Sequence, residues 1–162
     1  MKAKPVRESQ VLRTEIVHPG DTNPLGNIFG GTVVEWMDKA AAICAMRHSR
    51  TNVVTASIDA LSFLSPIKVG YFVILKTSVN YTGKTSMEIG VRVEAENPMT
   101  GETQHTATAY LTFVAIDENG KPIPVPPVLP ETAIEKKRYE MAKKRREARL
   151  HITKERAKIY DK

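Results

Sequence analysis

Residues 23–38 read Asn-Pro-Leu-Gly-Asn-Ile-Phe-Gly-Gly-Thr-Val-Val-Glu-Trp-Met-Asp, and this stretch decides the fold. It begins with turn-forming residues, continues through a pair of glycines and ends on a single carboxylate, Asp38. From Thr32 onward, apolar residues recur at steps of three and four, which is the helix period: Val33, Val34, Met37, Ala40, Ala41, Cys44 and Ala45. The pattern predicts a mostly apolar helix that begins at Gly30-Gly31. Its last turn holds Arg47 and His48, basic residues that suit the negative end of a helix dipole.

The glycine pair and Asp38 suggest chemistry on a carbonyl group. The first amides of a helix have no intrahelical acceptor, and glycines let another group approach the backbone closely. Gly30 and Gly31 could therefore hold a carbonyl oxygen that becomes negative. Asp38 follows Gly31 by seven residues, which is about 10 Å along the helix axis. That is too far for both to serve one carbonyl from the same helix, so we expect a homodimer in which a second copy completes each site.

Strand patterns follow on both sides of this helix. Alternating or β-rich residues predict strands at 9–17, 52–64, 71–81, 86–96 and 105–116. The last four are joined by short connections, which favour antiparallel neighbours. The sequence therefore predicts an α+β fold, in which one long helix is wrapped by a curved antiparallel sheet.

The C-terminal part has a different composition. Residues 121–130 contain five prolines and are predicted to form an extended linker that does not pair in a sheet. Residues 131–162 favour a helix without a continuous apolar stripe, so we expect it to be solvated or partly docked. They hold 12 Lys/Arg and 6 Asp/Glu, which equals the whole net charge of +6. The predicted divisions are a main domain at 1–120, a linker at 121–130 and a basic helical tail at 131–162.

Composition excludes several classes of protein. Residues 1–130 hold 12 Lys/Arg and 12 Asp/Glu, so this part of the chain lacks the basic field expected of a nucleic-acid-binding protein. No apolar run approaches the roughly 20 residues of a membrane span. Residues 1–9 are polar and show no signal peptide. One cysteine, Cys44, allows no internal disulfide and favours a reducing, cytoplasmic location. The four histidines are scattered and show no metal-ligand spacing.

Five motifs together resemble one family. They are residues 18–31, Trp36-Met37-Asp38 with Ala40-Ala41, residues 63–70, Gly83-Lys84-Thr85-Ser86, and residues 111–115. The combination, within residues 9–118, resembles the hotdog-fold acyl-CoA thioesterases, specifically the cytosolic acyl-CoA hydrolase group. The tail after Pro130 lies outside the resemblance.

The resemblance implies a hydrolase of the EC 3.1.2 class that converts fatty acyl-CoA and water to a fatty acid and coenzyme A, with no metal and no other cofactor. Asp38 would be the general base or the nucleophile. Asn27 and amides near Gly30 and Gly31 would position the water or the thioester carbonyl. Residues 83–86 (Gly83, Lys84, Thr85 and Ser86) would lie near the coenzyme A phosphates. Relatives assemble from hotdog dimers, often as hexamers (trimers of dimers).

Simpler interpretations stay open beside these roles. Asp38 could be an exposed carboxylate paired with a cation, and Asn27 a turn or cap residue. Gly30 and Gly31 could merely relieve close packing, and Lys84 could be a hairpin lysine in water. Asn23 is expected to form a turn, Asp59 to make structural hydrogen bonds, and Cys44 to be a small core residue.

The leading alternative function is a non-catalytic acyl-CoA sensor, which would need no carboxylate. A hotdog dehydratase would want a histidine near the helix start, where Phe29 stands. An interaction protein would work through its basic tail.

Overall fold

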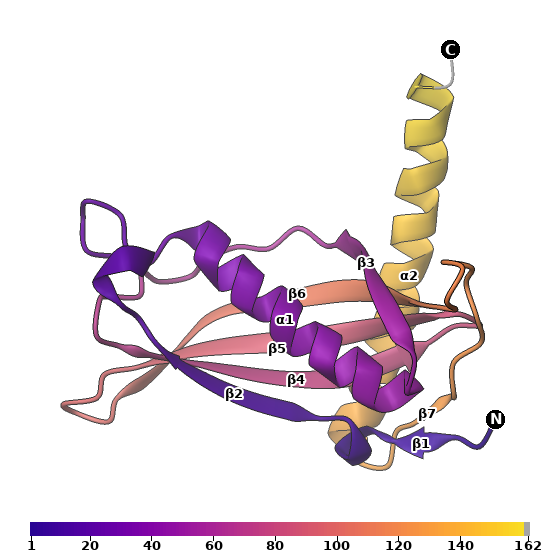
Figure 1. Cartoon of the computed structure of the whole chain (residues 1–162), viewed down its shortest axis with the longest axis horizontal. Coiled ribbons are helices and arrows are strands. Elements are labelled where there is room, and N and C mark those ends of the chain that lie inside the picture. The colour runs from indigo at the N-terminus through magenta and orange to yellow at the C-terminus, as the bar shows by residue number, and fades with distance from the viewer. Residues whose placement is uncertain (161–162) are drawn as a thin grey trace.

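The predicted apolar helix lies across a curved sheet, as Figure 1 shows. The structure is a computed structural model and describes residues 1–160. In chain order its elements are β1 (Lys4–Pro5), the 3-10 turn η1 (Val6–Glu8), β2 (Val11–Ile16), the 3-10 turn η2 (Pro19–Asp21), α1 (Gly30–Ser49), β3 (Asn52–Ile58), β4 (Phe72–Thr82), β5 (Ser86–Glu96), β6 (Thr103–Ile116), β7 (Val128–Leu129) and α2 (Ala133–Tyr160). No helix within residues 1–160 is long and apolar enough to cross a membrane.

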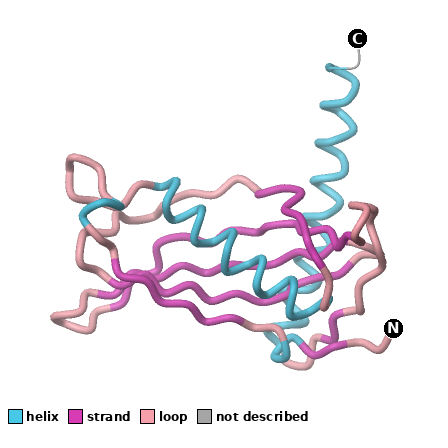
Figure 2. Tube along the Cα trace, in the orientation of Figure 1, coloured by secondary structure: helices cyan, strands magenta, loops and turns pink. Residues whose placement is uncertain are grey.

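The main sheet has five strands in the order β2-β4-β5-β6-β3, all paired antiparallel. Because side chains alternate along a strand, β5 turns Met87, Ile89, Val91, Val93 and Ala95 into the core and the residues between them to the opposite face. The apolar stripe of α1 covers this core face, and Figure 2 shows the helix crossing the strands. The α+β prediction of a long helix wrapped by a curved antiparallel sheet is confirmed.

Two predicted strands differ from those observed. The run predicted at 52–64 ends as a strand at Ile58, and residues 59–71 cross the sheet edge as a loop held at Asp59 and Leu64 by backbone bonds to β6. Phe63, in this loop, does not pair in the sheet, and its ring packs against the start of α1. In β2, Leu12 and Ile16 are 69% and 48% exposed. This edge strand therefore presents apolar side chains away from its own core.

The proline-rich segment is extended, as predicted, but the expectation that it makes no sheet pairing is wrong. Val128 and Leu129 form β7, which pairs in parallel with Lys4 and Pro5 of β1. They are the two consecutive residues of 122–130 that are not proline, so both keep a backbone amide. Farther up the segment, Val125 donates its amide to the Lys84 carbonyl at 3.0 Å. The segment is thereby fastened to the main domain.

The basic tail forms α2 and docks by part of its length. Ala142 is buried, and Tyr139 packs on Tyr81 of β4 with ring centroids 5.1 Å apart. Arg145 and Arg149 form ion pairs with Glu88 of β5. Glu88 alternates with the core residues of β5, so α2 covers the face opposite α1. Beyond this contact α2 projects from the domain (Figure 1), and residues 150–159 are exposed. The last two residues of the predicted tail, 161–162, lie outside the described residues.

His48 joins three segments at the end of α1. Its ring is buried, and its Nε2 donates a hydrogen bond to the Pro126 carbonyl at 2.9 Å, while Nδ1 faces the Ser9 hydroxyl at 3.4 Å. Burial is the main cause that lowers the pKa of His48 below its usual 6.5. The ring is therefore neutral at pH 7. Of the two basic residues expected to face the negative end of the α1 dipole, only the exposed Arg47 does so as a cation.

We expect His48 to make the folded state sensitive to acid. Its pKa is lower in the folded than in the unfolded state, so below about pH 6.5 the unfolded chain binds the extra proton more readily. The free energy of unfolding should fall as the pH drops through this range and be insensitive to His48 above it. Urea unfolding between pH 7.5 and 5.0 measures this. His48→Gln should flatten the dependence; equal slopes for the two proteins would contradict the assignment.

Candidate active site

Asp38 lies midway along α1 at the border between buried and exposed residues. Met37 and Ala40 on either side are buried, whereas Glu35 and Lys39 form an exposed pair at 2.5 Å. The Asp38 side chain is half-buried and accepts a hydrogen bond from the Thr55 hydroxyl at 2.8 Å. This bond fixes one carboxylate oxygen and leaves the other free for a reactant. The alternative of an ion-paired surface carboxylate is wrong, since no ion pair of Asp38 occurs within residues 1–160.

Thr55 is a site residue that sequence reasoning missed. It lies on β3, an edge strand of the main sheet, and stands 17 residues after Asp38. A threonine inside a β-rich run is an ordinary strand residue. Only the packing of β3 beside α1 brings its hydroxyl to the carboxylate. No pattern in a single sequence specifies that register, so the contact could not have been found before the fold was known.

A cleft of about 360 Å³ opens at the N-terminus of α1. Asn23, Asn27, Gly30 and Phe63 are among the residues that line it. A Cβ on Gly30 would stand 3.1 Å from the Phe63 ring, so glycine is needed for this close packing. Phe29 supplies no side-chain cap to α1. Its carbonyl accepts from the amides of Thr32 and Val33, at 3.1 and 3.3 Å, whereas the amides of Gly30 and Gly31 have no intrahelical acceptor. Gly31 is exposed with open space around its Cα. The cleft thus offers amide donors to an oxyanion.

The two asparagines in this cleft have different surroundings. The Oδ1 of Asn23 accepts hydrogen bonds from the amides of Leu25 at 3.0 Å and Asn27 at 3.3 Å. Asn23 therefore builds the turn, as predicted, while its Nδ2 remains a donor. The side chain of Asn27 makes no hydrogen bond to residues 1–160. Both amide groups are available to a ligand in the cleft.

The predicted coenzyme A turn joins β4 to β5. Gly83 donates its amide to the Ser86 carbonyl at 2.8 Å, which closes a tight hairpin. The carbonyls of Lys84 and Thr85 accept bonds from Val125 and Ala115, both at 3.0 Å. The turn thus directs its carbonyls toward the body, and the amides of Lys84 and Thr85 have no acceptor in the described part of the chain. Lys84 is exposed, so a cation and two free amides stand at this corner.

One chain does not bring these three groups together. Asp38 is absent from the lining of the cleft that holds Asn27 and Gly30, and eight helical residues separate it from Gly30, about 12 Å along the axis. The turn at Gly83 lies where the linker and α2 meet the sheet. The separation between Gly31 and Asp38 argued from the sequence therefore persists in the folded chain.

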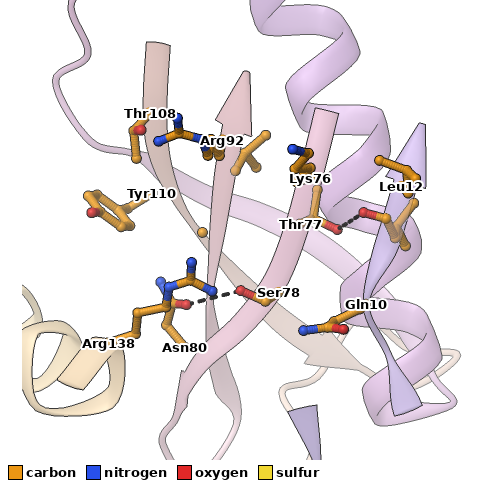
Figure 3. Close-up of a pocket in the computed structure, with 13 residues that line it drawn as sticks. Gln10, Leu12, Lys76, Thr77, Ser78, Asn80, Arg92, Thr108, Tyr110 and Arg138 are labelled. Atoms are coloured by element: carbon orange, nitrogen blue, oxygen red, sulfur yellow. Dashed lines mark hydrogen bonds between the residues drawn. The ribbon is translucent and has the colours of Figure 1, made fainter. Parts of the chain in front are cut away.

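A larger hollow, of about 650 Å³, lies on the opposite face of the sheet (Figure 3). Its cations Lys76 and Arg92 both pair with Glu94, at 2.5 and 2.6 Å, which lowers the pKa of that carboxyl. Gly90 forms part of the lining, and a Cβ there would stand 2.5 Å from the Asn80 amide. None of the residues predicted to act in catalysis lines this hollow.

Two other polar residues have structural roles. Cys44 is buried in the core, and burial raises the pKa of its thiol to about 11, so the thiol is protonated near neutral pH and is a poor nucleophile. Asp59 accepts a 2.7 Å bond from Arg149. Both findings agree with the structural interpretations drawn from the sequence.

Comparison with known proteins identifies relatives of the whole domain. The model of the thioesterase superfamily matches residues 25–102. A protein of Bacillus subtilis, the uncharacterized acyl-CoA thioester hydrolase YkhA, is 48% identical over 126 residues, which are 78% of this chain and 73% of the relative.

Solved structures agree with this match. A crystal structure of an apo-hexameric acyl-CoA thioesterase superposes with a TM-score of 0.91 at 47% identity and covers 94% of this chain and 98% of its own. The acyl-CoA hydrolase from Staphylococcus aureus, solved with butyryl coenzyme A, coenzyme A and coenzyme A disulfide, gives a TM-score of 0.89 at 39% identity, with 99% of both chains covered. The chain therefore belongs to the thioesterase superfamily, as a member of the hotdog-fold acyl-CoA thioesterases.

Proposed function

We propose that this protein hydrolyses the thioester of fatty acyl-CoA. The observation that carries the proposal is the half-buried Asp38 carboxylate, held by the Thr55 hydroxyl at the edge of the buried apolar face of α1. A carboxylate with one oxygen fixed and one free can take a proton from water or attack a carbonyl. A non-catalytic acyl-CoA sensor would not need this group.

In the general-base route, Asp38 takes a proton from water as the water oxygen attacks the thioester carbonyl carbon. The carbonyl electrons move onto oxygen, and the amides at Gly30 and Gly31 stabilise the oxyanion. When the carbon–sulfur bond breaks, the sulfur takes the proton from Asp38 and leaves as coenzyme A. In the alternative route Asp38 attacks the carbonyl and releases coenzyme A thiolate. Water then cleaves the resulting anhydride to the fatty acid.

The variants of the staphylococcal relative support Asp38 and Thr55, and their spacing favours Asn23 over Asn27. It has been solved as variants in which one aspartate, one threonine or one asparagine is replaced by alanine. The threonine follows the aspartate by 17 positions, the interval between Asp38 and Thr55. The asparagine precedes it by 15 positions, the interval between Asn23 and Asp38. Asn27 is the candidate chosen from the sequence, and Asn23, with its free Nδ2 in the same cleft, is a second candidate.

We assign the corner at residues 83–86 to the coenzyme A phosphates. The amides of Lys84 and Thr85 form a small concavity of donors, which suits a phosphate oxygen, and Lys84 adds a point charge. Ser86 closes the turn beneath them. The reaction needs no further cofactor, because coenzyme A is part of the substrate, and we place it in the cytoplasm, where the buried Cys44 thiol stays reduced.

We further propose that two copies form each site. Within residues 1–160 the edge strand β3 has a neighbour on one side only, and its Val54 and Ile58 are 44% and 41% exposed. An exposed apolar edge favours pairing with another chain. Such a dimer would bring a second Asp38–Thr55 pair toward the cleft of the first chain. A hexamer, the state of one solved relative, would then be a trimer of such dimers.

Release of free thiol from acyl-CoAs of short to long chain tests the proposal. We expect turnover on at least one chain length, without added metal. Tight binding of acyl-CoA with no turnover on any chain length would overturn the hydrolase and leave the sensor. If deletion of residues 131–162 abolished the protein's role in the cell while acyl-CoA hydrolysis continued, the protein would instead act as an interaction protein through its tail.

A further inference from the structure

We propose that Arg146, on helix α2, binds a phosphate of coenzyme A together with the Gly83–Ser86 turn. This inference rests on the proposed function and adds the C-terminal helix to the substrate site. The resemblance that identified the turn ends before this helix, so nothing in the motifs assigned the basic tail to the substrate.

The first observation is the position of Arg146. A Cβ built on Gly83 would stand 2.9 Å from the Ser86 hydroxyl and 3.8 Å from Arg146 Nε. The guanidinium group therefore lies beside the turn, on the side where Gly83 has no side chain. Glycine at this position leaves the room through which a ligand can reach both Ser86 and the arginine.

The second observation concerns unused charge. Arg145 and Arg149 are neutralised by Glu88 and Asp59, whereas Arg146 is half-buried and has neither an ion pair nor a hydrogen-bond acceptor within residues 1–160. A guanidinium group is planar, always charged and matched to phosphate geometry. Holding such a group partly buried without an anion is unfavourable, which a bound phosphate would relieve.

The third observation is that further donors surround the same point. The amides of Lys84 and Thr85 are unpaired in the described chain and face away from the body, because the carbonyls of the turn are bound from behind. Lys84 is exposed beside them. Two elements far apart in sequence thus bring two cations, Lys84 and Arg146, and two free amides to one corner.

The position of Arg146 is fixed by its neighbours. Arg145 donates to both oxygens of the buried Glu88 and stacks over the Tyr110 ring at 3.6 Å. These contacts set the rotation of α2, and Arg146 follows on the adjacent face, toward the turn. The backbone of Arg146 is therefore positioned beside the turn before substrate arrives, which reduces the entropy cost of forming a phosphate contact.

The experiment compares Arg146→Ala and Arg146→Lys with Arg156→Ala, a control about 15 Å farther along the same helix. Each is assayed on acyl-CoA and on the matching acyl-pantetheine, which lacks the nucleotide and its phosphates. We expect Arg146→Ala to raise the KM for acyl-CoA about 10-fold without changing kcat, and to leave the KM for acyl-pantetheine unchanged. Arg146→Lys should recover part of the loss, and the control should match wild type.

Acyl-dephospho-CoA distinguishes the phosphates. An equal loss on this substrate supports a contact with the diphosphate, and a loss confined to acyl-CoA supports a contact with the 3′-phosphate. An unchanged KM for acyl-CoA, or an equal rise on acyl-pantetheine, would overturn the proposal. If wild type hydrolyses no acyl-CoA, the hydrolase itself fails. Calorimetry of coenzyme A binding to wild type and Arg146→Ala then tests the site, and equal affinities would refute it.

Discussion

Replacing Asp38 by asparagine is expected to reduce kcat for acyl-CoA hydrolysis by about 1000-fold. Asparagine has the same shape and can still accept the hydrogen bond from Thr55, which is 2.8 Å long in the native protein. It has no negative charge, so it can neither take a proton from water nor form an anhydride. The KM should change little, because the coenzyme A groups bind elsewhere. Free-thiol release at saturating substrate measures the loss.

Glu35→Gln is the matched control for this experiment. Glu35 is an exposed carboxylate on the same helix, paired with Lys39 at the surface, and its removal should leave kcat within about twofold of wild type. Both variants should unfold at the same temperature as the native protein, since neither residue belongs to the buried core. If Asp38→Asn keeps more than a tenth of the native kcat, the carboxylate is not the reacting group, even though the enzyme assignment stands.

Mixing two inactive variants tests whether each site is shared between copies. One chain carries Asp38→Asn and the other carries whichever of Asn23→Ala and Asn27→Ala has the lower kcat. In a two-fold dimer with shared sites, a mixed dimer has one intact site and one doubly defective site. Random co-assembly from equal amounts should then restore about 25% of native activity. Sites built within one chain would recover none, because no mixed dimer would contain an intact pair.

Local sequence patterns predicted the elements that follow their own periodicity. The helix period from Thr32 gave α1 and its buried face, and the alternation around Met87 and Ile89 gave β5 with its bounds. The conformation of each of these residues depends on neighbours only a few positions away in the sequence, so a local pattern is enough to predict it. Gly30, at the start of α1, was likewise identified from local spacing, since helix ends carry their own signals.

Contacts between distant segments could not be predicted in this way. Thr55 reaches Asp38 only because β3 packs beside α1, and Arg146 reaches Gly83 only because α2 crosses the outer face of the sheet. Glu88 occupies a polar position of an alternating strand, which normally faces water, yet it is buried beneath two arginines of the tail. The same alternation fits a solvated and a covered face, so the sequence could not decide between them.

Replacing Glu88 by alanine is expected to lower the free energy of unfolding by about 3–5 kcal/mol. The Glu88 side chain is 1% exposed, and it accepts bonds from Arg145 at 2.6 Å and Arg149 at 2.8 Å. Its removal would leave two partly buried guanidinium groups facing each other, with only Asp59 bonded to Arg149. For a chain of this size the midpoint of thermal unfolding should drop by about 10 °C.

Glu155→Gln, in the exposed pair with Lys158 on the same helix, is the surface control and should shift the midpoint by less than about 2 °C. A triple variant with Glu88→Leu, Arg145→Met and Arg149→Leu removes the pair without leaving a charge behind, and it should recover much of the lost stability. A Glu88→Ala midpoint within 2 °C of that control would contradict a buried network.

Because Glu88 sets the rotation of α2, its alanine variant should also release Arg146 and raise the KM for acyl-CoA but not for acyl-pantetheine. The stability of the fold and the binding of coenzyme A would then depend on the same carboxylate. This explains how α2, a helix with no continuous apolar face, can contribute to the substrate site.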